Sequence, residues 1–361
     1  MNQIKRRSPK DGLLPVEVVF HPSWWHRYAG LSFDPDFYYH PVRRVEDERR
    51  MEMVLFERFG DLGLGEDHRR DVPSIGAVHN AAGFLLSEML GCRVVYPEDG
   101  PPLVVPAEQP DLTLDVEAAF ASPAYLRFER LIRELKARFG YVSGDVNWAG
   151  VLNLALDLRG QAIFLDMVDR PAEVHGYFRR IGQVIERFTA LLERESGTTS
   201  ISVNRTVRHL AAPVFLHSEC ALTMISVAHY RDFLFPLDED WSRRKRPFGV
   251  HYCGADPHRF AGSFVALPHL DFLDVGWGGD LKLLRERLPD TFLNIRLSPV
   301  EIVGWSETEI RRAIEERMEA AGDPRRTGVC CINMDDRVTD AQVRAIFETV
   351  FDLRLRFAAR F

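Results

Sequence analysis

The chain is 361 residues long, and its 46% hydrophobic and 27% charged residues are typical of a globular enzyme. Its formal net charge of −7 excludes the basic surface that nucleic-acid binding requires, and no apolar run approaches the roughly 18 residues of a membrane span. Five cysteines, an odd number with two of them adjacent, do not form a disulfide framework, so we expect a protein of the reducing cytoplasm.

The N-terminal part of the chain alternates between regular elements and loop-rich stretches. Residues 14–20 predict a first buried strand, residues 41–58 a charged amphipathic helix, and residues 60–65 a short second strand. Three further stretches are expected to be irregular: a flexible basic tail at 1–12, an aromatic-rich insertion at 21–40 and a proline-rich insertion at 76–112. The aromatic side chains of the second stretch either plug the mouth of a barrel or line a pocket.

From residue 141 onward, predicted strands and helices alternate regularly. Strands are expected at 142–148, 212–219, 247–254, 270–277, 290–297 and 327–333. Helices are expected at 115–138 and 171–195, and from the end of the strand 212–219 through Phe235. Two more helices begin with capping boxes, Ser306 with Glu309 and Thr339 with Gln342.

Eight strands, most of them followed by a helix, predict a (β/α)₈ TIM barrel that residues 1–361 form as a single domain. Right-handed crossovers would close the parallel sheet. The carboxyl ends of the strands then meet at one face of the barrel, where functional side chains gather. The polar residues that end several predicted strands are therefore the candidate site residues.

His251 and Cys253 stand two residues apart near the end of the predicted strand 247–254. Side chains at i and i+2 of a strand lie on one face, so the imidazole and the thiol are expected side by side, where they suit Zn²⁺. A third ligand is expected from the last strand, whose side-chain alternation favours Cys331, with Cys330 as the alternative. Three protein ligands and one open position are typical of a catalytic zinc. The other interpretation is that all these residues are buried in the core.

Other polar side chains at predicted strand ends are candidates for catalysis or substrate binding. Glu219 and Asp61 are the candidate catalytic carboxylates, and a solvated strand end is the alternative for each. His217 shares a strand face with Glu219 and, together with Asp274 and Arg296, is a candidate for substrate binding. Arg296 either binds an anionic group of the substrate or forms a salt bridge inside the barrel rim. The sequence contains no nucleophile elbow, Walker loop or zincin helix.

Three segments carry a resemblance to a known family: residues 216–220 (Leu-His-Ser-Glu-Cys), 250–254 (Val-His-Tyr-Cys-Gly) and 328–331 (Gly-Val-Cys-Cys). Over residues 205–350 the chain resembles the uroporphyrinogen decarboxylase superfamily. The resemblance is closer to the zinc-dependent, corrinoid-linked methyltransferase branch of that superfamily than to its decarboxylases.

The resemblance implies a zinc ion that is held by His251, Cys253 and either Cys331 or Cys330. It also implies that this zinc activates a thiol or another acceptor for methyl transfer to or from a corrinoid protein. The decarboxylases carry paired arginines after the first strand, where this chain has the unrelated segment 21–30, so porphyrinogen decarboxylation is not expected. Their catalytic aspartate could correspond to Asp61.

Three functions are consistent with these features. The favoured one is a zinc-dependent methyltransferase that moves a methyl group between a corrinoid protein and a small-molecule thiol or other heteroatom. The first alternative is a metal-free lyase that acts on a carboxylated tetrapyrrole or small molecule, with Asp61 and either Arg27 or Arg296 as its polar groups. The second is a non-catalytic accessory protein that binds a corrinoid or a metal. None of the three requires a nucleic-acid or membrane partner.

Overall fold

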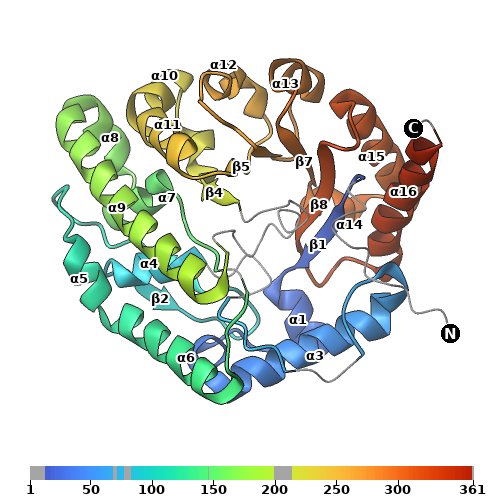
Figure 1. The fold of residues 1–361 in the computed structure, drawn as a ribbon, viewed down its shortest axis with the longest axis horizontal. Coiled ribbons are helices and arrows are strands. Elements are labelled where there is room, and N and C mark those ends of the chain that lie inside the picture. The colour runs from blue at the N-terminus through green and yellow to red at the C-terminus, as the bar shows by residue number, and fades with distance from the viewer. Residues whose placement is uncertain (1–12, 68–70, 77–82, 145, 199–213, 360–361) are drawn as a thin grey trace.

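A curled parallel β-sheet runs through the molecule and carries helices on its outer side (Figure 1). The computed structural model describes residues 13–67, 71–76, 83–144, 146–198 and 214–359, so the predicted tail at 1–12 lies outside the described residues. The six strands follow the order β1-β8-β7-β6-β5-β4. They are β1 (Val16–Phe20), β4 (Phe215–Ser218), β5 (Phe248–Tyr252), β6 (Phe272–Val275), β7 (Phe292–Leu297) and β8 (Thr327–Met334).

The neighbouring strands of this sheet are all parallel, so their carboxyl ends meet at one edge. The register places His251 of β5 level with Asp274 of β6, and Asp274 level with Asn294 of β7. These three side chains therefore share one face of the sheet. His217 of β4 points the other way and contacts Trp241 in the helix layer. The face that carries His251 is consequently the concave one.

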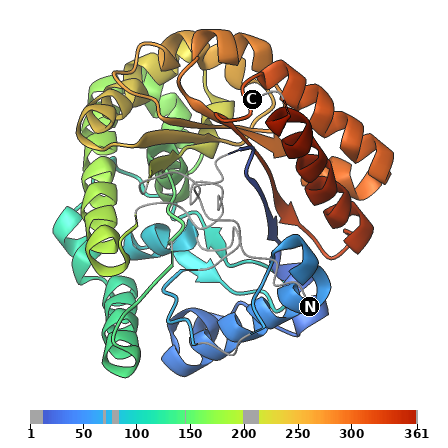
Figure 2. The same ribbon diagram turned by 45° about the vertical axis from the view of Figure 1, so that its right-hand side comes forward.

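Helices cover the convex side of the sheet and continue the ring beyond it (Figures 1 and 2). Those that follow the strands are α11 (Phe235–Arg244), α12 (Ala261–Phe264), α13 (Leu281–Arg287), α14 (Pro299–Gly304), α15 (Glu307–Ala321) and α16 (Asp340–Ala358). The predicted helix through Phe235 is formed from Val227 onward, because α10 (Val227–His229), the π-helical segment η6 (Tyr230–Leu234) and α11 follow one another without a break. Before it lies the 3-10 turn η5 (Cys220–Met224), and a second 3-10 turn, η7 (Pro257–Phe260), precedes α12. The capping boxes predicted at Ser306 and Thr339 are both formed and begin α15 and α16.

The N-terminal half of the chain is mainly helical. Its longer elements are α3 (Pro41–Phe59), α4 (Phe84–Met89), α5 (Val116–Ala121), α6 (Pro123–Phe139), α7 (Val151–Arg159), α8 (Ala162–Asp169) and α9 (Pro171–Ser196). The stretch 76–112 also contains an antiparallel pair, β2 (Arg93–Val95) and β3 (Leu103–Val105). The predicted helix 115–138 is divided at Ser122, whose side chain caps α6. Across the described part of the chain, no helix has the length and apolar character needed to span a membrane.

Two of the predicted strands are not formed. Residues 60–65 make a short 3-10 turn, η2 (Gly60–Leu62), and continue through Gly63 and Gly65 with φ values of +83° and +71°. Glycine adopts such values without steric cost, and they do not fit an extended strand. In the described part of 142–148, Ser143 forms a single bridge with Ser74. The described residues thus form an α/β half-barrel of six strands where the sequence predicts a barrel of eight.

The aromatic-rich stretch 21–40 is helical, whereas the sequence suggested a loop. It forms α1 (Pro22–Ala29) and α2 (Pro35–Tyr39). Each helix begins with a proline in its first turn, preceded by a side chain that caps the helix, His21 and Asp34 respectively. Trp24 and Phe37 are completely buried. These aromatic side chains are therefore part of the hydrophobic core.

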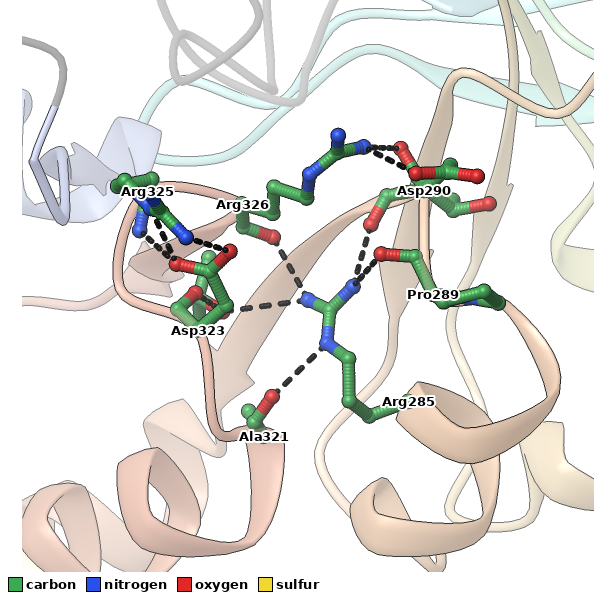
Figure 3. A network of polar contacts seen from close by, with 9 residues as sticks. Arg285, Pro289, Asp290, Ala321, Asp323, Arg325 and Arg326 are labelled. Carbon is green, nitrogen blue, oxygen red and sulfur yellow. Dashed lines mark hydrogen bonds and ion pairs between the residues drawn. The ribbon is translucent and has the colours of Figure 1, made fainter.

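At the edge where the strands begin, a polar network centres on Arg285 of α13 (Figure 3). Its Nε donates to the carbonyl of Ala321 at 2.9 Å, Nη1 to that of Thr291 at 2.9 Å, and Nη2 to that of Arg326 at 2.8 Å. One side chain thereby joins the end of α15 to the segments that enter β7 and β8.

Candidate metal centre

Three potential metal ligands, Cys220, His251 and Cys253, meet at the carboxyl ends of β4 and β5 and form what we call the Cys–His cluster. One ligand atom from each residue lies within 4.8 Å of the other two. His251 Nε2 is 2.9 Å from Cys253 Sγ. The sulfur atoms of Cys220 and Cys253 are in contact, paired as a disulfide, and their Cα atoms are 5.0 Å apart. When reduced, the same two side chains offer two thiolates to one metal ion.

The predicted proximity of His251 and Cys253 is present, but the third member of the cluster is Cys220 and neither Cys331 nor Cys330. Cys220 is the second residue after β4, and β4 lies beside β5 in the sheet. The strand-end rule that selected the other candidates applies equally to Cys220. It was a signal in the sequence that the prediction passed over.

The side-chain alternation predicted for the last strand is wrong. Cys330 is level with Arg296 of β7, and Asn294 donates through Nδ2 to Cys330 Sγ at 3.1 Å, so Cys330 lies on the concave face and Cys331 on the helix side. The prediction assigned the more apolar set to the helices, whereas the concave face of this strand also accepts Ile332. Burial raises the pKa of the Cys331 thiol to about 12 and that of Cys330 well above its usual range. Neither sulfur belongs to the group of ligand atoms that meets at the ends of β4 and β5.

Asp274 fixes the orientation of His251. Its Oδ2 lies 2.5 Å from Nδ1 of the imidazole, and both side chains are buried. The carboxylate accepts a hydrogen bond from Nδ1–H of the neutral imidazole, so Nε2 presents its lone pair to the two cysteines. Burial lowers the pKa of His251, against the opposing effect of Asp274. The neutral imidazole is the form that binds a metal. Asp274, predicted to bind substrate, therefore contacts the cluster through His251.

His217 and Glu219 do not face the cluster. Glu219 accepts hydrogen bonds from the backbone N–H groups of Leu152 at 2.9 Å and Asn153 at 3.2 Å, in the first turn of α7. His217 Nε2 lies 3.2 Å from Glu219 and Nδ1 lies 2.7 Å from Asp238 of α11. These buried contacts attach β4 to its covering helices. These contacts give no support to the predicted catalytic role of Glu219 or to the predicted substrate-binding role of His217.

Asp61 does not lie at a strand end, where the sequence placed it, because the predicted strand 60–65 is not formed. Its carboxylate pairs with Arg344 of α16, and its side chain is 57% exposed. The hydrogen bond from Arg344 lowers the pKa of Asp61. A surface ion pair of this kind gives no support to the metal-free lyase, which required Asp61 beside a substrate.

Arg296 lies next to the Cys–His cluster. Its Nη1 donates to Cys253 Sγ at 3.3 Å and is 3.5 Å from His251 Nε2. The side chain is only 3% exposed, and its guanidinium lies over the ring of Trp277, 5.3 Å from the centroid. Within the described ranges of the chain, Arg296 forms no ion pair with a carboxylate, so the salt bridge considered from the sequence is not found there.

The comparisons with known proteins concern the fold. No family model matches the chain, and no curated protein matches it. Among solved structures, it is similar to a methyltransferase from Methanosarcina mazei, with a TM-score of 0.66 and 13% identity over 94% of each chain. It is also similar to a B12-independent methionine synthase from Shewanella sp. W3-18-1, with a TM-score of 0.51 and 11% identity over 96% of this chain and 98% of the other. At such identities the likeness shows an α/β fold of the TIM-barrel type.

Proposed function

We propose that the protein is a zinc-dependent methyltransferase whose metal is held by Cys220, His251 and Cys253. The observation that carries the proposal is the convergence of these three ligand atoms within 4.8 Å of one another. They lie at the carboxyl ends of parallel strands, where the enzymes of this fold place their active sites. Two structural neighbours that are described as a methyltransferase and a methionine synthase support the same class of reaction.

The donor set fits zinc. Two thiolates and one imidazole are ligands that Zn²⁺ prefers, and three protein ligands leave one position for a substrate. Asp274 holds the imidazole of His251 at 2.5 Å in the tautomer that such a site needs. The contact between the sulfurs of Cys220 and Cys253 implies that the site is competent only when both cysteines are reduced.

When bound, zinc would lower the pKa of a thiol or similar heteroatom of the substrate and so make it nucleophilic at neutral pH. The protein ligands set the charge of the site. The thiolates of Cys220 and Cys253 balance the charge of the metal, and neutral His251 adds none. In the transfer itself, a sulfur–carbon bond forms while the bond between the methyl carbon and its carrier breaks, and the bonding electrons leave with the carrier.

A corrinoid is the methyl carrier that the sequence resemblance favours. A corrinoid protein would then be the macromolecular partner, and the cobalt would accept the electron pair of the broken cobalt–carbon bond. The fold alone leaves the carrier open, because one of its structural neighbours is described as B12-independent. Assays with methylcobalamin and with a methylated folate, each with a panel of small thiols, separate the two carriers.

The proposal is tested first by measuring the zinc content of the purified, reduced protein by mass spectrometry. We expect about one zinc ion per chain. Cys220→Ala and Cys253→Ala should lose it. Cys330→Ala and Cys331→Ala are matched controls, because they remove buried thiols outside the cluster, and they should keep it.

Wild-type protein that neither contains zinc nor takes it up would refute the metal site. If Cys331→Ala or Cys330→Ala lost the zinc and Cys220→Ala retained it, the third ligand would be a cysteine of β8 and not Cys220. Methyl transfer that persists after chelation, with any thiol in the panel, would refute the proposed role of the metal.

A further inference from the structure

Arg296 is a buried cation that pairs with no carboxylate among the described side chains, and its side-chain hydrogen-bond contacts are with Cys253 and His251. Only 3% of its surface is exposed. Removing a charge from water is costly unless it is paired, and buried arginines are normally matched by carboxylates. The residues that the structure describes therefore leave this guanidinium without a carboxylate partner.

The hydrogen bonds of the guanidinium occupy only one of its nitrogens. Nη1 contacts the Cys–His cluster through Cys253 and His251. Nε is buried and has no hydrogen-bond partner among the residues that the structure describes. The contacts of the guanidinium with the described residues are made through Nη1, not Nη2. Nε and Nη2 form one edge of the guanidinium, the edge that binds a carboxylate side-on through two parallel hydrogen bonds.

Trp277 packs against the guanidinium of Arg296. Its ring covers the guanidinium at 5.3 Å and is itself 36% exposed. The backbone holds both residues in place, because Trp277 N donates to Gly254 O at 3.3 Å and Arg296 N donates to Gly276 O at 3.2 Å. A Cβ on Gly276 would overlap the carbonyl oxygen of Gly254, so this close approach requires glycine. The loops that follow β5 and β6 are thus fixed against each other beside the cluster.

We propose that the Nε–Nη2 edge of Arg296 binds a carboxylate of the substrate while the substrate's heteroatom is held at the Cys–His cluster. The inference rests on the proposed function for the second of these contacts. Arg296 Nη1 is only 3.3 Å from Cys253 Sγ, so the two binding positions lie close together. The carboxylate and the heteroatom of the substrate must therefore belong to one small molecule and be separated by a few bonds. The substrate class is therefore a small carboxylate that carries a thiol or a comparable heteroatom.

The test compares two thiols that differ only in charge. Protein loaded with Co²⁺ in place of zinc is titrated with 3-mercaptopropionate and with its neutral amide, 3-mercaptopropionamide, and binding is followed by the visible spectrum of the cobalt. We expect the carboxylate to bind about 10- to 100-fold more tightly than the amide, as charge-assisted hydrogen bonds predict. Arg296→Met should abolish this preference and keep the weaker binding of the amide, and Arg296→Lys should keep part of it.

Arg246→Met is the control, because Arg246 pairs with Asp271 at the far edge of the sheet, and it should retain the full preference. Equal affinities of the wild-type protein for the two thiols would overturn the carboxylate site and leave the metal site standing. A cobalt spectrum that neither thiol changes would overturn the proposed function, and this inference with it. The wild-type comparison decides the matter even if Arg296→Met fails to fold.

Discussion

His217 is buried between Asp238 and Glu219, in the layer where β4 meets its covering helices. Burial lowers the pKa of the imidazole, but the two carboxylates outweigh burial and raise it to about 10. The folded protein therefore holds a proton that the unfolded chain releases near the ordinary value of 6.5. We expect the stability that this contact contributes to be complete below pH 6.5 and to be lost as pH rises toward 10.

The measurement is the free energy of unfolding in urea across this pH range. The wild-type protein should lose up to about 1.4 kcal/mol per pH unit from this group. His217→Gln should be less stable at neutral pH, because it leaves Asp238 and Glu219 without their cation, and the slope should be smaller. Equal slopes in the wild-type protein and His217→Gln would contradict the assignment.

At the residue scale, the sequence predicts which side chains are neighbours when both belong to the same strand. His251 and Cys253 were expected to be neighbours because the two-residue repeat of a strand is local. The third member of the cluster comes from the strand beside β5, and the strand-end rule pointed to Cys220 as much as to the cysteines of β8. Cys220 was nevertheless missed, and the choice between Cys331 and Cys330 followed an apolar pattern that this strand shows on both faces.

At the element scale, the entry of α7 depends on Gly150. The backbone N–H of Gly150 donates to the carbonyl of Ser218 at 2.7 Å. A Cβ at this position would overlap that carbonyl oxygen and lie 2.6 Å from Glu219 Oε2. The absence of a side chain thus lets the helix approach the end of β4, just before Cys220.

We expect Gly150→Ala to lower the free energy of unfolding by about 1–3 kcal/mol, as overpacking does. Gly176→Ala is the matched control in α9, where a Cβ meets no atom within 4 Å. That change should stabilise the protein by about 0.5–1 kcal/mol, because alanine has a higher helix propensity than glycine. Thermal and urea unfolding of both variants provides the check. A Gly150→Ala protein as stable as the wild type would show that the contact has room to relax.

The elements that the sequence predicts well are those whose signals are local. The capping boxes of α15 and α16 each require two side chains three residues apart, and both are present in the structure. The expected strand at 60–65 failed because strand formation needs a partner from elsewhere in the chain, while its glycines favour turns. The stretch 21–40 was interpreted from its aromatic content, and the proline and capping signals of α1 and α2 were overlooked.

At the scale of the whole molecule, the carboxyl ends and the amino ends of the strands carry different groups of polar residues. The edge at the strand ends carries the Cys–His cluster, and the edge at the strand beginnings carries the network of Arg285 (Figure 3). Stability and metal binding should therefore be separable by mutation. This division is a property of parallel sheets, whose carboxyl ends carry function and whose amino ends carry stability.

Arg285→Met tests the separation. The side chain is half-buried, and burial lowers the pKa of its guanidinium, which donates to backbone carbonyls and not to a carboxylate. Charged hydrogen bonds contribute about 1.5–3 kcal/mol each but are not additive, so we expect a loss of about 2–4 kcal/mol in the free energy of unfolding. Arg285→Lys should lose most of the same stability, because a single ammonium does not reach three separate carbonyl groups.

Arg325→Met is the control, since that exposed guanidinium pairs with Asp323 at the surface, where solvent screens the ion pair, and its loss should change the stability much less. The zinc content of Arg285→Met should equal that of the wild type, because the network and the cluster lie at opposite edges of the sheet. Urea unfolding and metal analysis of the same preparations measure both quantities. Loss of zinc from folded Arg285→Met would mean that the two edges are coupled through β7 and β8. In that case Arg296 of β7, which contacts the cluster, would be the first residue through which to trace the coupling.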